Sequence, residues 1–455
     1  YTVVPVAASG CLGDPLVVVL TVNPEPVMDP ALALKTICSR ATTSITLNTN
    51  GTSVAAALYD VSLVSQDVGL TGTPTTGANL AANAIFNDLF TNVTGIPLKV
   101  VYSIVPKSGV PCLGAAFTIT VTVNPEPVIS PTLDNIICSD DITNIVLGTN
   151  GTSASAASYE LMSLVVPGTV TASVGNIVVG TTGSINLIRN DRFTNTTAAA
   201  VVVVYGIRGI SNSGCVGQIQ LINLTVNPKP VLDPALSPTA VCSGLPANVT
   251  LAVAPSSVAA VTYNLNGITF TGLTAGPTNA IIGPGKLANA IFNDVYINTS
   301  AGPLQAIYTI VPVSATGCLG SPGTVTFTIN PAPALLPGLG RTVCSTDAGG
   351  IILGSSGSSI PAANYNIISV TIDPSLTQTA GNTGARTAVG INEISADRFE
   401  NLSNSVRTVT YRIEPVSAAG CRGPQVDVVL TVEPTITMIT PPNASLCSDS
   451  PNTPS

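Results

Sequence analysis

The chain has 455 residues and a formal net charge of −8; 8% of its residues are charged, 45% are apolar, and histidine and tryptophan are absent. This apolar fraction excludes an intrinsically disordered chain, and 15 basic residues are too few for a nucleic-acid surface. The lack of histidine removes the commonest general base and the commonest zinc ligand, and the length suits about three to five domains.

The first residues already follow a strand pattern. The sequence opens at Tyr1 without a charged and apolar leader, which predicts an internal part of a longer mature protein. The longest apolar run, residues 198–207, is shorter than the ~20 residues that a membrane-spanning helix needs. We therefore expect no membrane insertion in this segment.

A repeat of about one hundred residues organises the rest of the chain. Asn-Pro-x-Pro tetrads recur in steps of 101, 103 and 103 residues, and a degenerate copy, Glu433-Pro434, follows after another 103. The tetrads begin at Asn23, Asn124, Asn227 and Asn330. Tyrosines keep the same register at Tyr1, Tyr102, Tyr205, Tyr308 and Tyr411. An Asp-x-aromatic-x-Asn element does so at Asp88–Asn92, Asp191–Asn195, Asp294–Asn298 and Asp397–Asn401.

The residue pattern of each repeat predicts strands and no helices. The length of a repeat matches that of an immunoglobulin-type sandwich. In the first repeat we expect an early strand at Ser44–Leu47, a middle strand at Tyr59, and a strand carrying Tyr102. The last strand, residues 117–123, alternates apolar residues with threonine, which is typical of a half-buried strand. Later copies of the early strand are expected at Asn144–Leu147 and Gly350–Leu353. The predicted fold class is all-β: tandem immunoglobulin-like sandwiches that form an extended rod.

The tetrads predict stiff, short linkers, because proline fixes φ and lacks the N–H that strand pairing needs. The linker prolines are Pro24, Pro26, Pro125, Pro127, Pro228, Pro230, Pro331 and Pro333. The expected domains are the end of a repeat at 1–23, whole repeats at 24–125, 126–228, 229–331 and 332–434, and the start of another at 435–455.

From the third repeat into the start of the fourth, the pattern includes Tyr308-Thr309-Ile310-Val311-Pro312, Thr316-Gly317-Cys318-Leu319-Gly320, Ile329-Asn330-Pro331-Ala332-Pro333 and Val343-Cys344-Ser345. These motifs resemble the PKD-like repeats of surface proteins of the Bacteroidota. Gly209 departs from this pattern by replacing the proline found four residues after the other repeated tyrosines. The sequence is especially similar to repeats of the giant gliding-motility adhesin (SprB-type). This resemblance implies an adhesin that is exported by type IX secretion and displayed on the outer surface.

Ten cysteines fall two to a repeat, which predicts disulfides formed outside the cytoplasm. In an immunoglobulin topology the two cysteines of one repeat lie at opposite ends, ~25–35 Å apart, whereas a disulfide needs Cα atoms within ~7 Å. We therefore expect bonds between adjacent repeats, with pairing within a repeat, such as Cys38 with Cys112, as the main alternative. The predicted pairs are Cys38–Cys215, Cys138–Cys318 and Cys242–Cys421, with Cys11, Cys112, Cys344 and Cys447 bonded beyond this segment.

Other candidate sites have ordinary structural explanations. The Asp-x-aromatic-x-Asn element is interpreted as a turn whose polar side chains bind nearby backbone N–H groups, since too few acids surround it for calcium. The repeated tyrosines Tyr102, Tyr205, Tyr308 and Tyr411 are expected in the core, with the hydroxyl satisfied at an edge. Asn-x-Thr matches such as Asn92-Val93-Thr94 are attributed to chance, and lysines out of register give no support for Lys–Asn crosslinks.

We expect a structural and adhesive module, with no catalytic site, cofactor or metal. The expected partners are neighbouring repeats, surface polysaccharide or a substratum, and gliding or secretion machinery bound through other regions. The expected location is extracellular, on a filament attached to the outer membrane. Glycan-binding units, or spacers of another secreted surface protein, are the alternatives that the sequence leaves open.

Overall fold

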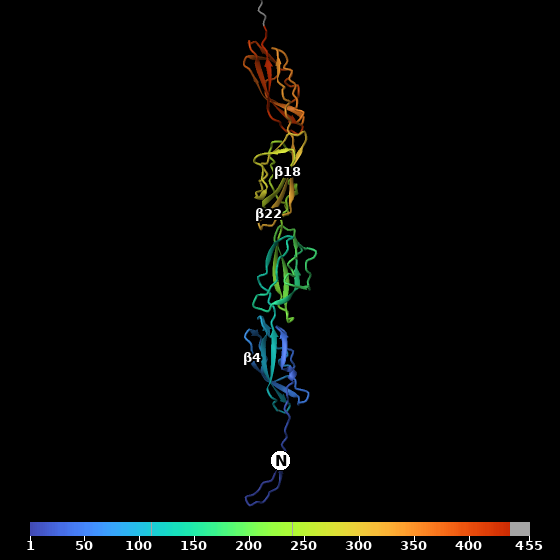
Figure 1. The fold of residues 1–455 in the computed structure, drawn as a ribbon, viewed down its shortest axis with the longest axis vertical. Coiled ribbons are helices and arrows are strands. Elements are labelled where there is room, and N and C mark those ends of the chain that lie inside the picture. Colours follow the sequence, from blue (N-terminus) through green and yellow to red (C-terminus); the bar gives the residue numbers. More distant parts are fainter. Residues whose placement is uncertain (111, 239, 437–455) are drawn as a thin grey trace, which may run out of the picture. The chain divides into compact units, whose positions relative to one another are not determined.

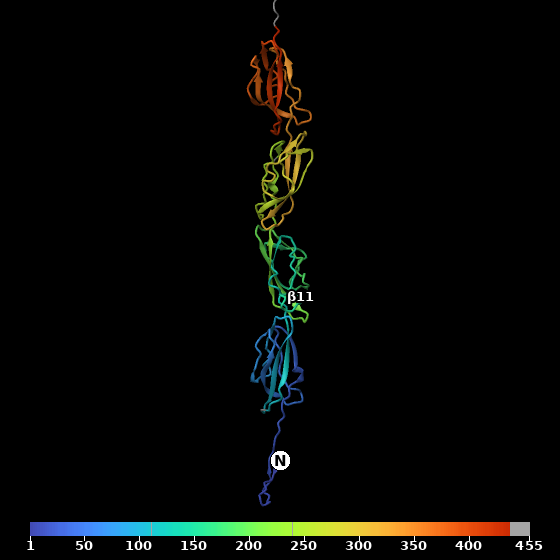
Figure 2. The same ribbon diagram turned by 60° about the vertical axis from the view of Figure 1, so that its left-hand side comes forward.

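The computed structural model describes residues 1–110, 112–238 and 240–436. The chain divides into two compact units, Tyr1–Pro228 and Lys229–Ser455, here called unit 1 and unit 2. Unit 1 contains a short hairpin of β1 (Thr2–Val3) and β2 (Leu16–Val17), followed by domains 1 and 2. Unit 2 contains domains 3 and 4. Figure 1 labels β4 in domain 1 and the paired strands β18 and β22 in domain 3, and Figure 2 labels β11 in domain 2.

Every domain repeats one order of strands. Domain 1 contains η1 (Pro30–Leu32), β3 (Leu34–Cys38), β4 (Ala56–Gln66), β5 (Leu70–Thr71), β6 (Gly77–Leu80), β7 (Thr91–Asn92), β8 (Leu98–Ser108) and β9 (Phe117–Asn124). Domain 2 contains β10 (Asn135–Cys138), β11 (Ala156–Val165), β12 (Val170–Ala172), β13 (Thr182–Gly183), β14 (Phe193–Asn195), β15 (Val201–Ser211) and β16 (Gln220–Asn227).

Unit 2 follows the same plan. Domain 3 contains η2 (Pro234–Leu236), β17 (Val241–Cys242), β18 (Ala260–Phe270), β19 (Leu273–Ala275), β20 (Gly283–Lys286), β21 (Tyr296–Asn298), β22 (Leu304–Ser314) and β23 (Gly323–Asn330). Domain 4 contains β24 (Arg341–Val343), β25 (Ala362–Ile372), β26 (Leu376–Ala380), β27 (Arg386–Val389), β28 (Arg398–Asn401), β29 (Arg407–Ser417) and β30 (Val426–Val432).

Each domain packs a five-stranded sheet against a second layer with a two-stranded sheet. In domain 1 the large sheet has the order β3-β9-β8-β4-β6, and β5 pairs with β7. The first strand β3 runs parallel to the last strand β9, while the other neighbours are antiparallel. The same parallel pairing joins β10 to β16, β17 to β23 and β24 to β30. The first and last strands of each domain are therefore direct neighbours.

The core of domain 1 lies between these layers. Alternate residues of β8 and β9, such as Tyr102 and Val121, point inward and are fully buried. Phe90 and Ile85 cover them from the second layer. Each of the four domains encloses a separate cluster of this kind. The all-β tandem sandwich fold predicted from the sequence is therefore confirmed.

The early strand was predicted at the wrong place. The first strand of domain 1 is Leu34–Cys38, whereas Ser44–Leu47 lies outside the sheets. Ser44 has a positive φ of 51°, which interrupts an extended strand, and the N–H of Leu47 donates to Ala82 O rather than to a strand. Ile45 and Leu47 are nevertheless buried, so their alternation imitates a strand pattern. Asn144–Leu147 and Gly350–Leu353 differ from the prediction in the same way.

The expectation of no helices was also slightly wrong. Short 3₁₀ helices occur at η1 and η2, each beginning with a proline. Asp29 caps η1 by accepting a hydrogen bond from the N–H of Ala31, and Asp233 caps η2 through the N–H of Ala235. These turns lead the chain from a linker into the first strand.

Candidate functional site: the junctions between domains

The linker between domains 1 and 2 is part of the folded structure rather than a loose tether. Pro125, Glu126 and Pro127 are all buried. The prolines have no N–H to satisfy, and the N–H of Glu126 donates to Asn92 O at 3.0 Å. In unit 2 the corresponding prolines, Pro331 and Pro333, are buried as well.

A hairpin turn of the following domain lies against each of these linkers. The β15–β16 turn brings Gly217 so close to Pro127 that an added Cβ would stand 2.0 Å from the proline carbonyl oxygen. The β29–β30 turn does the same with Gly423 and Pro333, at 1.8 Å. Gly114 and Gly320 approach Pro26 and Pro230 alike. The glycine of the recurring Cys-x-Gly motif is therefore required by close backbone packing.

Disulfides cross both junctions that lie within a unit. Cys38, the last residue of β3, is bonded to Cys215 in the β15–β16 turn, with Cα atoms 5.3 Å apart. Cys242, the last residue of β17, is bonded to Cys421 in the β29–β30 turn, also at 5.3 Å. Both pairs are among those that the sequence suggests.

The remaining cysteines fall into two groups. Cys138 and Cys318 are each disulfide-bonded. Their expected bond to one another stays a prediction, since Cys138 lies in unit 1 and Cys318 in unit 2. Cys11, Cys112 and Cys344 are free thiols in this chain. Cys447 lies outside the described residues. Bonds from these cysteines to further repeats stay predictions too.

The first junction also holds an ion pair whose carboxylate is buried. Glu126 is only 1% exposed, and its Oε1 accepts a hydrogen bond from Nε of Arg40 at 2.8 Å. Its Oε2 has no hydrogen-bond partner among the described residues. Because a buried carboxylate without a partner is costly, Arg40 is needed for as long as Glu126 is present.

An asparagine ties each domain to its own last strand just before the linker. Nδ2 of Asn195 donates to Ala199 O and to Val226 O in β16, both at 2.8 Å. Its Oδ1 accepts from the N–H and hydroxyl of Thr197, and its N–H donates to the Ser139 hydroxyl. Asn92, Asn298 and Asn401 repeat this arrangement.

This asparagine arrangement corrects one sequence interpretation and explains a second motif. The Asn-x-Thr matches in the repeat, such as Asn92-Val93-Thr94, do not arise by chance, since the threonine N–H and hydroxyl satisfy the asparagine. The serine of the Cys-Ser motif also has a role, because Ser39 accepts the N–H of Asn92. Asn92 is fully buried and is therefore not a free acceptor for a glycan.

The aspartate of the same element binds the repeated tyrosine. The Tyr205 hydroxyl donates to Asp191 at 2.9 Å, inside the core, and Asp191 also accepts the N–H of Ile177. The corresponding pairs are Tyr102–Asp88, Tyr308–Asp294 and Tyr411–Asp397. The tyrosine hydroxyls thus lie in the interior rather than at an edge. A constant spacing of 14 residues between aspartate and tyrosine was the signal that the sequence offered.

Burial dominates the electrostatics of these pairs. Loss of solvent raises the pKa of Asp191, Asp294 and Asp397 above the usual aspartate value, against the effect of their hydrogen bonds. Burial, together with the neighbouring carboxylate, raises the pKa of Tyr205 far above its ordinary range. Tyr102, Tyr205, Tyr308 and Tyr411 are fully buried, so these groups serve the core and offer no surface to a substrate.

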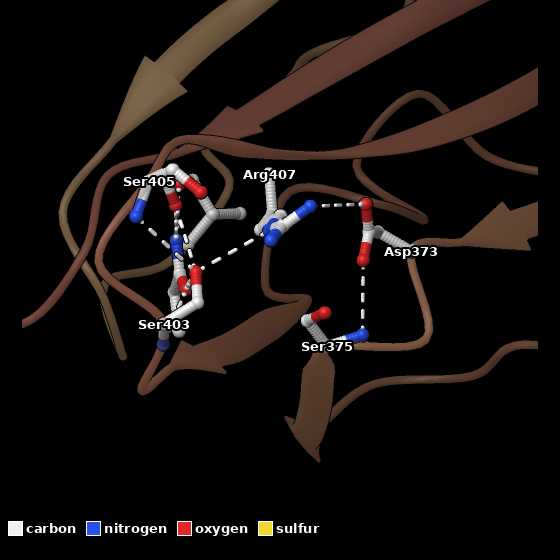
Figure 3. A network of polar contacts seen from close by, with 7 residues as sticks. Asp373, Ser375, Ser403, Ser405 and Arg407 are labelled. Carbon is white, nitrogen blue, oxygen red and sulfur yellow. Dashed lines mark hydrogen bonds and ion pairs between the residues drawn. The ribbon is translucent and has the colours of Figure 1, made fainter.

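Figure 3 shows a polar network in domain 4, beside the turn that follows Asn401. Arg407, at the start of β29, donates from Nε to the Ser403 hydroxyl at 3.3 Å and contacts Asp373 at 3.5 Å. The N–H of Ser375 donates to the other Asp373 oxygen. That hydrogen bond, and secondly the charge of Arg407, lowers the pKa of Asp373. The network fastens the loop before β26 to the asparagine turn.

One lysine approaches an asparagine, which bears on covalent crosslinking. Nζ of Lys107 lies 2.9 Å from Asn79 Oδ1 and 2.7 Å from Asp60 Oδ2. The hydrogen bond from Lys107, followed by that from the Asn79 N–H, lowers the pKa of Asp60. Both side chains are partly exposed, so the arrangement is a surface ion pair and gives no support for a Lys–Asn crosslink.

The described residues were also compared with the requirements of a metal site and of a membrane-spanning helix. No three histidine, cysteine, aspartate or glutamate side chains gather there as possible ligands of a metal ion. Nor does any helix formed by these residues have the length and apolar character to cross a membrane.

Comparison with known proteins identifies the repeated domain. The family model described as the PKD-like domain matches residues 35–127, 136–230, 239–333 and 357–436. The chain belongs to the PKD-like domain family. Each PKD-like match contains the middle strand, the tyrosine strand and the last strand of one sandwich. No curated protein matches the chain.

Several solved structures are similar to the chain, each with low sequence identity and a low TM-score. A protocadherin γB4 extracellular domain is 10% identical, with 96% of this chain and 77% of that chain covered and a TM-score of 0.22. Titin domains I67–I69 are 9% identical, with 68% and 99% covered and a TM-score of 0.25. Drosophila N-cadherin EC1–4 is 12% identical, with 89% and 100% covered and a TM-score of 0.20.

Proposed function

We propose that this chain is the structural repeat region of a bacterial cell-surface adhesin filament, of the gliding-motility kind, exported by type IX secretion and attached to the outer membrane. Its role is to project a distal part from the cell and to transmit force. The observation that carries this proposal is a disulfide across a proline-linked junction in each unit. Disulfides persist in extracellular proteins, and a covalent bond between domains keeps them joined when a non-covalent contact would open.

The strand arrangement supports a mechanical role. In domain 1 the first strand β3 and the last strand β9 are parallel neighbours, and Cys38 lies opposite Asn124 in their register. Where the chain alone carries the load, as when the junction disulfide is reduced, tension at the two ends of such a domain pulls these strands in opposite directions along their length. The ladder hydrogen bonds are then loaded together rather than one after another. The same pairing occurs in all four domains.

The proposed partners are neighbouring PKD-like repeats, to which free cysteines such as Cys112 and Cys344 would be bonded. Surface polysaccharide or a substratum would be bound by a distal region, and the gliding or secretion machinery by another. We propose the sequence-based domain limits, at 24–125, 126–228, 229–331 and 332–434, as the repeat boundaries.

An in-frame deletion of residues 126–331 from the parent protein tests the role as a spacer. It removes two whole repeats and leaves Cys38 and Cys421 in neighbouring domains, so that a junction disulfide can still form. We expect secretion to continue and a distal label to lie closer to the cell surface. Adhesion lost without any change in label distance would instead show that these repeats bind the target.

A glycan array probed with the 455-residue chain tests the alternative function directly. Since the core tyrosines Tyr102, Tyr205, Tyr308 and Tyr411 are fully buried, they provide no stacking surface for a sugar. We expect no specific glycan binding. Saturable binding to one glycan class would favour lectin-like repeats over a structural filament.

A further inference from the structure

The disulfide in unit 1 joins the first strand of one domain to the last hairpin of the next. From Pro26 the chain passes through η1 and β3 and reaches Cys38 at the end of that strand. Cys215 is followed by β16 and then by the linker at Pro228. The bond therefore closes a loop with a sequence separation of 177 residues, and this loop holds nearly all of domains 1 and 2.

Unit 2 has the same connectivity. Cys242 ends β17, the first strand of domain 3, and Cys421 precedes β30, the last strand of domain 4. This second loop has a sequence separation of 179 residues. Only short stretches lie outside both loops: residues 1–38, 215–242 and 421–455.

We propose that these disulfides form a covalent bypass that carries tension past the folded domains and limits how far the chain can be stretched. Under load the continuous covalent route runs from Cys38 to Cys215 and from Cys242 to Cys421. The residues inside the loops can lose their fold, yet they cannot add their length to the chain. This inference deepens the proposed function, but the connectivity behind it can be tested without any assumption about adhesion.

The location of the bonded cysteines supports a bypass at the point where load would arrive. Cys38 lies opposite Asn124 in the register of β3 and β9, and Asn124 is the residue at which the chain leaves domain 1. The N–H of Ser39 donates to Asn124 O at 2.9 Å. On the other side, Gly217 of the Cys215 turn lies against Pro127, where the chain enters domain 2. Force passing through the linker is therefore shared with a covalent bond directly beside it.

The test is single-molecule stretching of the full chain, held at both ends after oxidative folding. The wild-type chain should reach a contour length of about 350 Å, from the residues outside the loops at ~3.5 Å each. C38S/C215S should lengthen it by about 500–600 Å. If Cys138 and Cys318 are bonded to one another, the gain in contour length is smaller but stays within about 500–600 Å. Contour length does not depend on whether a variant folds, so a destabilised variant still gives a decisive result.

The matched control is C112S/C344S, which changes cysteines at the corresponding turn and strand positions that are free in this chain. It should leave the contour length unchanged. Reduction of the wild-type chain with dithiothreitol should release about 1,200 Å, since both loops open. A C38S/C215S chain as short as the wild type would overturn the bypass. A short wild-type chain, together with surface repeats that bind glycans, would instead overturn only the proposed function.

Discussion

The junction between domains 1 and 2 and the junction between domains 3 and 4 share a backbone arrangement but differ in charge. Both have buried prolines, a hairpin glycine against a proline carbonyl, and a disulfide with Cα atoms 5.3 Å apart. The first adds the pair of Arg40 and Glu126. In the second, the corresponding positions are Gly244 and Ala332. The difference teaches that backbone packing and the disulfide define a junction, while the ion pair is a local addition.

The largest effect is expected from filling the space that both junctions leave for the linker carbonyl. In G217A the new Cβ would stand 2.0 Å from Pro127 O, and in G423A 1.8 Å from Pro333 O, so the turn must move away. We expect each variant to lose most of its own junction disulfide and to keep the other. Peptide mapping without reduction measures this directly.

The control for these glycine variants is G357A, because nothing lies within 4 Å of a Cβ at that position. It should keep both disulfides. If G217A formed the Cys38–Cys215 bond at the wild-type level, the close approach of turn and linker would not be a requirement of the junction.

The next effect separates the two junctions. Removing one partner of a buried ion pair typically costs about 3–5 kcal/mol, and the 44% exposure of Arg40 lowers this expectation for R40A to about 2–3 kcal/mol. E126A, which copies Ala332 of the second junction, should change the free energy of unfolding by less than about 1 kcal/mol. Denaturant unfolding of R40A, E126A and R40A/E126A measures both effects. If E126A were as damaging as R40A, the ion pair would be essential to the junction.

A smaller effect compares the tyrosine–aspartate pairs in the two units. Y205F leaves Asp191 without its hydroxyl donor, at a cost of about 1–3 kcal/mol. Y308F should cost more, because the Tyr308 hydroxyl contacts both Asp294 and the Tyr296 hydroxyl. Thermal unfolding of the two variants ranks them. Equal losses would show that the Tyr296 contact contributes nothing to stability.

Much of this arrangement follows from sequence, and the rest shows where sequence patterns mislead. The hundred-residue period gave the sandwiches, and the turn positions of Cys38 and Cys215 suggested a bond between adjacent domains. The alternation at Ser44–Leu47 predicted a strand that the left-handed backbone at Ser44 interrupts. The pairing of Asp191 with Tyr205 was missed because the two motifs were interpreted separately, although their spacing is constant.

The smallest effect is a pH dependence of stability that these aspartates impose on both units. Burial raises the pKa of Asp191 in unit 1 and of Asp294 and Asp397 in unit 2, so the folded protein binds protons more tightly than the unfolded chain does. Their contribution is fully present below the ordinary aspartate pKa of about 4 and is lost as the pH rises through the raised values. D191N should flatten this fall, since an asparagine has no proton to lose and can still accept the tyrosine hydroxyl. Denaturant unfolding of the wild type and D191N from about pH 3 to about pH 7, a range that brackets the ordinary aspartate pKa, measures the difference. A wild-type curve that rose more steeply than that of D191N over this range would reverse the sign and contradict the raised pKa.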